Sequence, residues 1–420
     1  MLEGRDRTGG RIYTDRSWSD AAIDLGASWI HGIGDSPVCR LARESRIAIH
    51  RTNYDSLPRT YTDRGISVTA NERLVLGATL ERILDKTGTT RSATDSLANA
   101  VKRAIAEESL SQEQETVLRH LINVEIEQDY AADVEDLSLR YWDEVDDFEG
   151  EHAIIPGGFD RIIDALVHDV DVKLDHIVTG IEYDNHGVTV LTARGAYVGD
   201  HAIVTVPLGV LKTGSIAFSP ALPARKALAL ERLRMGTLNK IFLRFAKCFW
   251  PRNRDWLEYV SDRPVMWPIF FNLFRYVRKP VLTGFAVGAH GRRLEQMDDQ
   301  AVIGEAMGVL RGAFGPNGPE PTSVRITRWT SDPFCYGSYC HIPPSASGED
   351  CDALAAPIGQ RVFFAGEATN RLRYGTVCGA LISGNRAART IALAHRKRGL
   401  KATSDSGGMM SAVVGQSSVV

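Results

Sequence analysis

The spacing of apolar positions in the first third of the chain predicts its clearest helix. Between Leu118 and Ile126 apolar residues recur three and four positions apart, which is the spacing of one helix face. Ser111 and Gln114 stand three residues apart at the start of this pattern, as in a capping box. A helix is therefore expected over residues 109–131.

Strict alternation of apolar and polar residues predicts strands in the middle of the chain. Residues 239–250 alternate in this way, which indicates a half-buried strand with Lys240, Phe242 and Arg244 on one face. Residues 172–192 read as two strands joined by a turn around residues 185–187.

Helices and strands alternate at both ends of the chain, whereas a helix and antiparallel-looking strands occupy the middle. This order predicts an α/β fold in which a nucleotide-binding domain, assembled from separated pieces, is interrupted by a substrate-binding domain. The expected nucleotide-binding pieces are residues 1–50, 152–211 and 345–400, the substrate-binding pieces are residues 51–151 and 212–344, and residues 401–420 are an expected disordered tail.

Composition narrows the class of protein. The 420 residues carry a net charge of −3, which gives no support to nucleic-acid binding, and no apolar run reaches the length of a membrane span. No signal peptide is visible, and the six cysteines show no CxxC spacing, so a cytoplasmic or other reducing intracellular compartment is expected. Cys335, Cys340, His341 and Cys351 stand near one another but match no standard zinc pattern, and no metal site is expected.

Two stretches could form a ligand site. In "FFAGEATNRLRYGTVCGALISG", a buried strand is followed by Gly366, by the acceptor Glu367 and by a helix expected to start near Thr376, whose free N–H groups would favour an anionic ligand. In "GASWIHG", small residues would let a flat ring approach Trp29, with His31 nearby. The alternatives are a tightly packed strand–loop–helix and a packed aromatic residue beside a surface histidine.

Two further features have a functional and an ordinary interpretation. Lys240 is either a solvated strand end or a buried amine whose lowered pKa lets it hold or deprotonate a water. The aromatic residues of "RWTSDPFCYGSYC", which include Tyr339, either line a site for an amine or form a core cluster.

The first residues, "MLEGRDRTGGR", have the pattern that ends the second strand of a dinucleotide-binding βαβ unit. There an acidic residue, here Glu3, holds a ribose hydroxyl, and a GxGxxG turn stands about 20 residues earlier. No GxGxxG occurs in the chain. We therefore expect a Rossmann-like domain whose first βα unit is missing from this N-terminus.

Seven stretches, in the same order along residues 2–394, resemble the FAD-dependent amine oxidase family, which includes polyamine and spermine oxidases, flavin monoamine oxidases and flavin histone-lysine demethylases. They are "LEGRDRTGGRI", "DLGASWIHG", "IIPGGFDRI", "VPLGVLKTGSIAFSPALP", "LNKIFLRFAKCFW", "RWTSDPFCYGSY" and "FFAGEAT…GTVCGALISG". The form "GASWIHG" is similar to the polyamine oxidase branch.

The resemblance implies an FAD cofactor, a Rossmann-like FAD-binding domain and an α+β substrate-binding domain with a mixed sheet. It implies cofactor-binding roles for Glu3, Arg5, Arg11, Ser28, Trp29, Val178, Glu367, Thr376 and Val377. It also implies that Lys240 holds a water near flavin N5, that Tyr339 covers the flavin face and that His31 faces the substrate amine.

The implied reaction is oxidation of an amine, a polyamine in the first instance, to an imine by hydride transfer to the flavin, with O2 as acceptor and hydrogen peroxide as product. The acidic residues of the loop 143–151 could attract a polycation or form a solvated surface; they are Asp143, Glu144, Asp146, Asp147, Glu149 and Glu151. The sequence does not indicate an oligomeric state.

This sequence departs from the family pattern at two positions beside the expected flavin. Cys378 stands where the family often has histidine, and Arg373 begins "RYG" in place of an aromatic–Pro–Gly. Two other hypotheses remain: a non-catalytic scaffold that cannot hold FAD, and a protein-lysine demethylase, which is disfavoured because no inserted helical hairpin, reader domain or basic stripe is visible.

Overall fold

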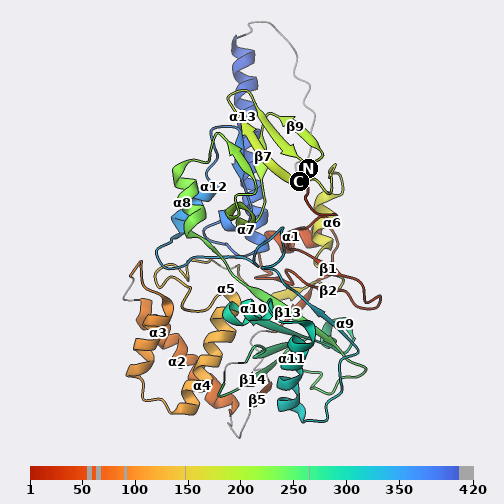
Figure 1. Cartoon of the computed structure of the whole chain (residues 1–420), viewed down its shortest axis with the longest axis vertical. Coiled ribbons are helices and arrows are strands. Elements are labelled where there is room, and N and C mark those ends of the chain that lie inside the picture. The colour runs from red at the N-terminus through yellow and green to blue at the C-terminus, as the bar shows by residue number, and fades with distance from the viewer. Residues whose placement is uncertain (54–58, 63–67, 89–91, 147, 264, 406–420) are drawn as a thin grey trace.

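The computed structural model describes residues 1–53, 59–62, 68–88, 92–146, 148–263 and 265–405. Figure 1 shows a lower part built around a large sheet and an upper part that carries the long C-terminal helix. Among the described residues, no helix is both long enough and apolar enough to cross a membrane.

A six-stranded mixed sheet forms the centre of the lower part, in the order β17-β13-β16-β15-β14-β5. Its strands are β5 (Arg59–Thr62), β13 (Leu238–Arg244), β14 (Trp256–Val260), β15 (Ile269–Asn272), β16 (Val281–Val287) and β17 (Ser323–Ile326). Neighbours are antiparallel except for the parallel pair of β14 and β5.

The two faces of this sheet meet different partners because strand residues alternate between faces. Ile241 and Leu243 of β13 pack with Val302 and Met307 of α11. On the opposite face, Phe242 packs with segment 18–23. Both faces of β13 are thus buried, so the expectation of a half-buried strand is wrong, although the shared face of Lys240, Phe242 and Arg244 matches the period-two pattern.

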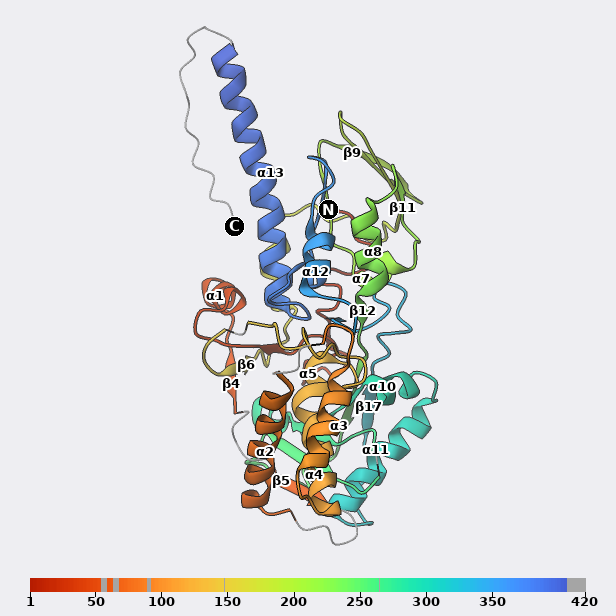
Figure 2. The same cartoon turned by 90° about the vertical axis from the view of Figure 1, so that its left-hand side faces the viewer.

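A helical layer covers the β14 end of the sheet, beside α11 (Figure 2). It consists of α2 (Ala70–Gly88), α3 (Leu97–Glu107), α4 (Gln112–Ile122) and the short α5 (Gln128–Tyr130). The capping box predicted at Ser111 and Gln114 is present, and the apolar face from Leu118 to Ile126 is buried. The helix predicted over residues 109–131 begins at Gln112, ends at Tyr130 and contains a π-helical turn, η1 (Asn123–Glu127).

The upper part contains several small sheets. Parallel pairing joins β10 (Ala202–Val204) to β19 (Val362–Phe364), and a parallel bridge joins Leu2 to Lys173. A four-stranded sheet has the order β11-β7-β8-β9, with β7 (Val178–Tyr183), β8 (Val188–Thr192), β9 (Gly195–Gly199) and β11 (Ala217–Ser219). The described strands therefore form separate sheets, and one doubly wound parallel sheet is not seen among them.

The remaining elements connect these sheets. The short strands are β1 (Thr14–Asp15), β2 (Ile23–Asp24), β3 (Trp29–Ile30), β4 (His50–Thr52), β6 (His152–Ile154), β12 (Arg234–Met235) and β18 (Cys340–His341). The helices are α1 (Pro37–Glu44), α6 (Arg161–Val167), α7 (Leu208–Lys212), α8 (Ala224–Arg232), α9 (Phe274–Val277), α10 (Gly288–Leu294), α11 (Asp299–Phe314), α12 (Gly348–Ala355), the 3₁₀ turn η2 (Glu367–Thr369) and α13 (Val377–Asp405).

Helix α13 continues further than the sequence pattern indicated. It runs from Val377 to Asp405 and projects beyond the rest of the upper part in Figure 2. The tail expected from residue 401 therefore begins with helix, because the lysine, leucine and alanine at 400–402 are good helix formers. Residues 406–420 lie outside the described part of the chain.

Candidate active site

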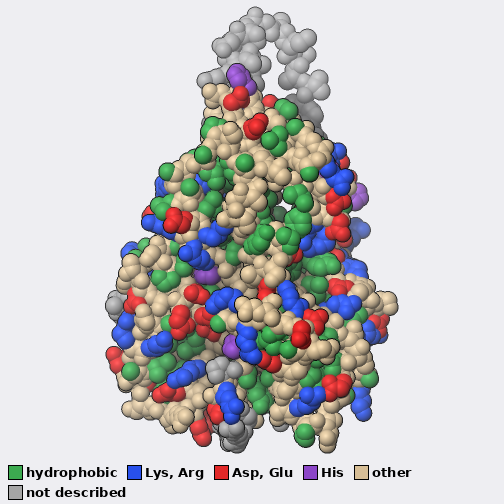
Figure 3. Space-filling view, in the orientation of Figure 1, with side chains coloured by type: hydrophobic (Ala, Val, Ile, Leu, Met, Phe, Trp, Pro, Cys, Tyr) green, Lys and Arg blue, Asp and Glu red, His purple; other side chains and the backbone are tan. Residues whose placement is uncertain are grey.

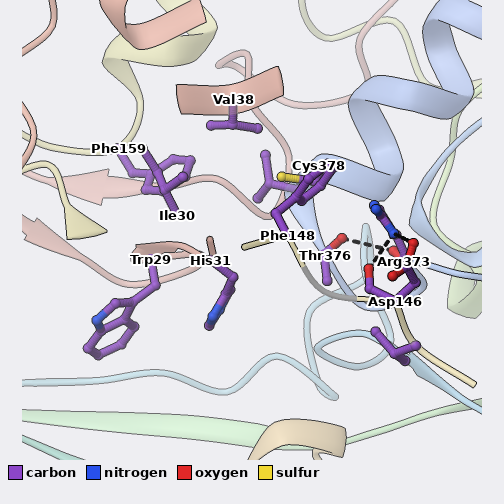
Figure 4. Close-up of a pocket in the computed structure, with 12 residues that line it drawn as sticks. Trp29, Ile30, His31, Val38, Asp146, Phe148, Phe159, Arg373, Thr376 and Cys378 are labelled. Carbon is purple, nitrogen blue, oxygen red and sulfur yellow. Dashed lines mark hydrogen bonds and ion pairs between the residues drawn. The ribbon is translucent and has the colours of Figure 1, made fainter. Parts of the chain in front are cut away.

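Two cavities meet at Trp29, which lines both of them. The first, the Lys240 cavity, has walls that include Asp24, Ser28, Lys240 and Phe271. The second, the His31 cavity, is lined by residues of five separate segments (Figure 4). They are Trp29, Ile30, His31, Val38, Val145, Asp146, Phe148, Phe159, Arg373, Thr376, Val377 and Cys378.

Lys240 lies at the wall of the first cavity because β13 turns this side chain away from α11. Its side chain is only 5% exposed, and Nζ donates hydrogen bonds to the carbonyl oxygens of Asp24 (3.0 Å) and Gly26 (2.5 Å) and to Ser28 Oγ (2.6 Å). Burial lowers the pKa of Lys240 to about 8, and the charge of Asp24 opposes this effect. The lysine is a buried amine, and the solvated-strand-end alternative is excluded.

Asp24 faces the same cavity and is a site residue for which the sequence suggested no role. Its Oδ1 accepts hydrogen bonds from Thr14 Oγ1 (2.6 Å) and from the backbone N–H of Phe159 (2.9 Å). Burial raises the pKa of Asp24 to about 6, whereas these two donors and the Lys240 charge favour the carboxylate. The only signal in the sequence was its place before "GASW", five residues ahead of Trp29.

Trp29 forms an aromatic wall between the cavities. Its ring stacks on Trp256 at 5.7 Å between centroids and meets Phe271 edge-on at 5.0 Å. Both partners come from the six-stranded sheet, so Trp29 joins that sheet to the upper segments.

His31 and His152 stand together beside the second cavity. Their ring centroids are 5.0 Å apart, and His152 Nδ1 accepts a hydrogen bond from the N–H of Gly32 (3.4 Å). The side chain of His31 is exposed to solvent through the open cavity. Many protein atoms nevertheless surround its ring, and this desolvation, together with the nearby His152, lowers the pKa of His31. His152 was not predicted, because a lone histidine ahead of an apolar strand carries no local signal.

The start of α13 forms the opposite wall of the second cavity. Thr376 Oγ1 accepts a hydrogen bond from the N–H of Gly379 (2.9 Å) and so caps the helix that begins at Val377. Sγ of Cys378 lies 3.2 Å from Ser36 Oγ, at the start of α1. The helix start expected near Thr376 is confirmed, and it opens toward a cavity.

Arg373 is held beside this cavity by the neighbouring acidic loop. It donates to Asp146 Oδ2 (2.9 Å) and lies over the Phe148 ring, while Arg371 pairs with Glu144 (3.1 Å). Internal ion pairs therefore offset part of the negative charge expected to attract a polycation. Asp147 lies outside the described residues, and positive and negative side chains are interspersed over the face shown in Figure 3.

Glu367 and Arg11 form an ion pair close to these cavities. Arg11 Nη1 donates to Glu367 Oε1 (2.8 Å), and Glu367 Oε2 accepts from the N–H of Gly375 (2.8 Å). Glu367 is 5% exposed. Tyr339 lies beside Gly375, and its hydroxyl donates to the carbonyl of Gln128 at the π-helical turn (2.7 Å).

The remaining predicted ligands lie together elsewhere, near the first residues of the chain. Glu3 and Arg5 pair through their backbones with segment 173–176, next to Val178 at the start of β7. The side chain of Arg5 is paired with Asp332 (2.6 Å). The structure thus divides the predicted residues into a group around Trp29 and a group around Glu3.

The cysteines and His341 do not form a ligand cluster. Among the described residues, no group of three or more His, Cys, Asp or Glu side chains is placed to hold a metal ion. Cys335 instead contacts Arg5 Nη2 at 3.2 Å.

Comparison with known proteins supports the family resemblance. Residues 1–392 match the model of a family described as flavin containing amine oxidoreductase. The chain is 36% identical over 417 residues to lysine-specific histone demethylase 1 homolog 2 of Oryza sativa subsp. japonica, covering 95% of this chain and 54% of that protein. It is 34% identical over 405 residues to polyamine oxidase 4 of the same organism, covering 92% and 82%.

A solved structure shows the same fold. Cyclohexylamine oxidase from Brevibacterium oxydans IH-35A superposes with a TM-score of 0.76 at 21% identity, covering 94% of this chain and 93% of that one. The chain spans about half the length of the histone demethylase relatives that it matches.

Proposed function

The chain belongs to the flavin-containing amine oxidoreductase family, and from that premise we propose that it oxidises an amine in the two cavities around Trp29. Membership of the family implies a flavin cofactor. The observation that carries the proposal is the buried Lys240 ammonium, which faces a cavity that shares Trp29 with the start of α13.

The residues around Trp29 fit a flat, electron-accepting ring. Trp29 supplies a planar wall, α13 supplies the N–H groups of its first turn, and Lys240 supplies a positive charge. We propose that Ser28, Trp29, Thr376 and Val377 hold the flavin ring, that Arg11 and Glu367 hold its chain, and that Glu3, Arg5 and Val178 hold the nucleotide end. When bound, the flavin supplies the two-electron acceptor for the amine.

Two side chains of the cavities, His31 and Lys240, would bind the substrate amine and the reacting water. A neutral His31 can accept a hydrogen bond from a substrate amine, and its lowered pKa keeps the imidazole neutral at neutral pH. The overall change converts an amine and O2 into an imine and hydrogen peroxide, and water then cleaves the imine into an aldehyde and a shorter amine. Lys240, whose three N–H bonds meet Asp24, Gly26 and Ser28, would orient the water with its positive charge.

We propose a polyamine as the first substrate to test. The form "GASWIHG" and the match over 82% of polyamine oxidase 4 support this choice. A methylated lysine side chain is the second candidate, because the histone demethylase relatives are 34–36% identical to the chain.

The test begins with the visible spectrum of the purified chain before and after addition of FAD. A flavin spectrum, followed by anaerobic bleaching and aerobic peroxide release with spermidine or spermine, is the expected result. Bleaching by a methylated lysine peptide alone would replace the polyamine with the second candidate. A protein that stays colourless with FAD would contradict the enzyme and leave the non-catalytic scaffold.

A further inference from the structure

Asp24 is placed by the pairing of two short strands. Thr14 of β1 stands directly opposite Asp24 of β2 in the antiparallel register, which brings the Thr14 hydroxyl within 2.6 Å of Asp24 Oδ1. The start of α6 supplies the second donor, the N–H of Phe159. Two donors on one oxygen of a buried carboxyl group favour its ionised form.

Lys240 is surrounded by neutral acceptors. The two carbonyl oxygens and the Ser28 hydroxyl that receive its N–H bonds carry no net charge. Asp24 offers its backbone carbonyl to Lys240 Nζ and lines the same cavity, and the charge of its carboxylate favours the ammonium form. Asp160 donates its backbone N–H to the same Thr14 hydroxyl and is paired with Arg16 at 2.9 Å, while Arg244, further along β13, is paired with Asp20.

We propose that Asp24 is a positioning residue that keeps Lys240 in its ammonium form and thereby fixes the loop that carries Trp29. An ammonium donates three hydrogen bonds, whereas a neutral amine donates two. Loss of the proton would release one of the Asp24, Gly26 and Ser28 acceptors, and these residues lead directly into Trp29. The charge of Asp24 therefore determines whether Lys240 keeps all three hydrogen bonds to the segment that leads into Trp29, the residue between the two cavities.

The inference rests on the proposed function only for its consequence in catalysis, since the protonation of Lys240 can be measured without turnover. The experiment is competitive acetylation of the purified chain with trace acetic anhydride between neutral and strongly alkaline pH. Mass spectrometry of the peptide that contains Lys240 gives the pH midpoint of its reactivity.

In Asp24→Asn, which keeps an oxygen able to accept from Thr14 and Phe159, the midpoint should fall by about one pH unit or more, as expected when a nearby opposite charge is removed. Asp24→Glu should restore most of the shift. The matched control is Asp20→Asn, which removes a carboxylate from the same side of the sheet but should leave the midpoint of Lys240 unchanged. An unchanged midpoint in folded Asp24→Asn would overturn the inference.

A reciprocal measurement serves if Asp24→Asn does not fold. In Lys240→Met, difference infrared spectroscopy should show the Asp24 carboxyl group becoming protonated at a higher pH than in the parent chain, because the two charges stabilise each other. Equal titration in both chains would overturn the inference. A shifted Lys240 midpoint in a chain that never oxidises an amine would instead contradict the proposed function and leave the Asp24 role standing.

Discussion

The two cavities that meet at Trp29 are built from different interactions. The Lys240 cavity depends on buried groups: its ammonium has backbone and hydroxyl acceptors, and its carboxylate has two fixed donors. The His31 cavity depends on an ion pair, Arg373–Asp146, in which the side chain of Asp146 is 63% exposed. Buried polar contacts are costly to break, whereas exposed pairs contribute little, so the first cavity is expected to be fixed and the second adaptable.

The largest effect should follow from removing the charge in the fixed cavity. Lys240→Met should lower the rate of amine oxidation by roughly 10²–10³-fold, the loss typical of one buried donor that stabilises a developing charge. The rate is measured by peroxide release from chains carrying equal amounts of flavin.

The matched control for this variant is Lys226→Met. Lys226 is also buried and also donates to three carbonyl oxygens, those of Ala353, Leu354 and Ala356, but it caps α12 and lines neither cavity. It should lose stability and keep its rate per flavin. Equal rate losses in the two variants would mean that Lys240 acts only through the fold.

The next effect concerns the wall that separates the cavities. Trp29→Ala should destabilise the chain by about 3–5 kcal/mol, because it removes the contacts with Trp256 and Phe271 and leaves a cavity. Urea unfolding followed by circular dichroism measures this change. Trp29→Phe keeps an aromatic wall and should cost less than about 1.5 kcal/mol; an equal cost for both variants would argue against stacking as the main contribution.

The next effect is a pH dependence of stability caused by His31 in the open cavity. The pKa of His31 is lowered from about 6.5 in the folded chain. As the pH falls, the histidine is therefore protonated at a higher pH in the unfolded chain than in the folded chain. The contribution of His31 to stability is therefore fully present above about pH 6.5 and is lost as the pH falls through the lower folded value. His31→Asn should flatten the decline of the urea midpoint in this acidic range, and an identical decline in both chains would contradict the lowered pKa.

The smallest effect is expected at the exposed pair. Arg373→Gln should change the stability by less than about 1 kcal/mol, because Asp146 is largely solvated. It should lower the KM for a polycationic amine by up to about fivefold, since one positive charge leaves the edge of the cavity. A larger change in kcat than in KM would show that Arg373 acts on the reaction rather than on substrate attraction.

Local patterns in the sequence determined the local structure well. The capping box at Ser111, the start of α13 near Thr376 and the shared face of Lys240 and Phe242 all follow from interactions within a few residues. The family also followed from the sequence, because its motifs stand in order along the chain. These features need no knowledge of which segments meet in space.

Tertiary structure alone decided the environment of the charged groups. The sequence around Lys240 is compatible with a solvated strand end, but in the structure segment 24–28 covers the lysine. The role of Asp24 depends on β1 and the start of α6, which place two hydrogen-bond donors at its carboxylate. Ion pairs between the acidic loop and Arg371 and Arg373 likewise join segments more than 200 residues apart. Burial and charge pairing depend on such distant contacts, whereas helix caps and strand periods depend on near neighbours, and this difference separates what the sequence determined from what the fold decided.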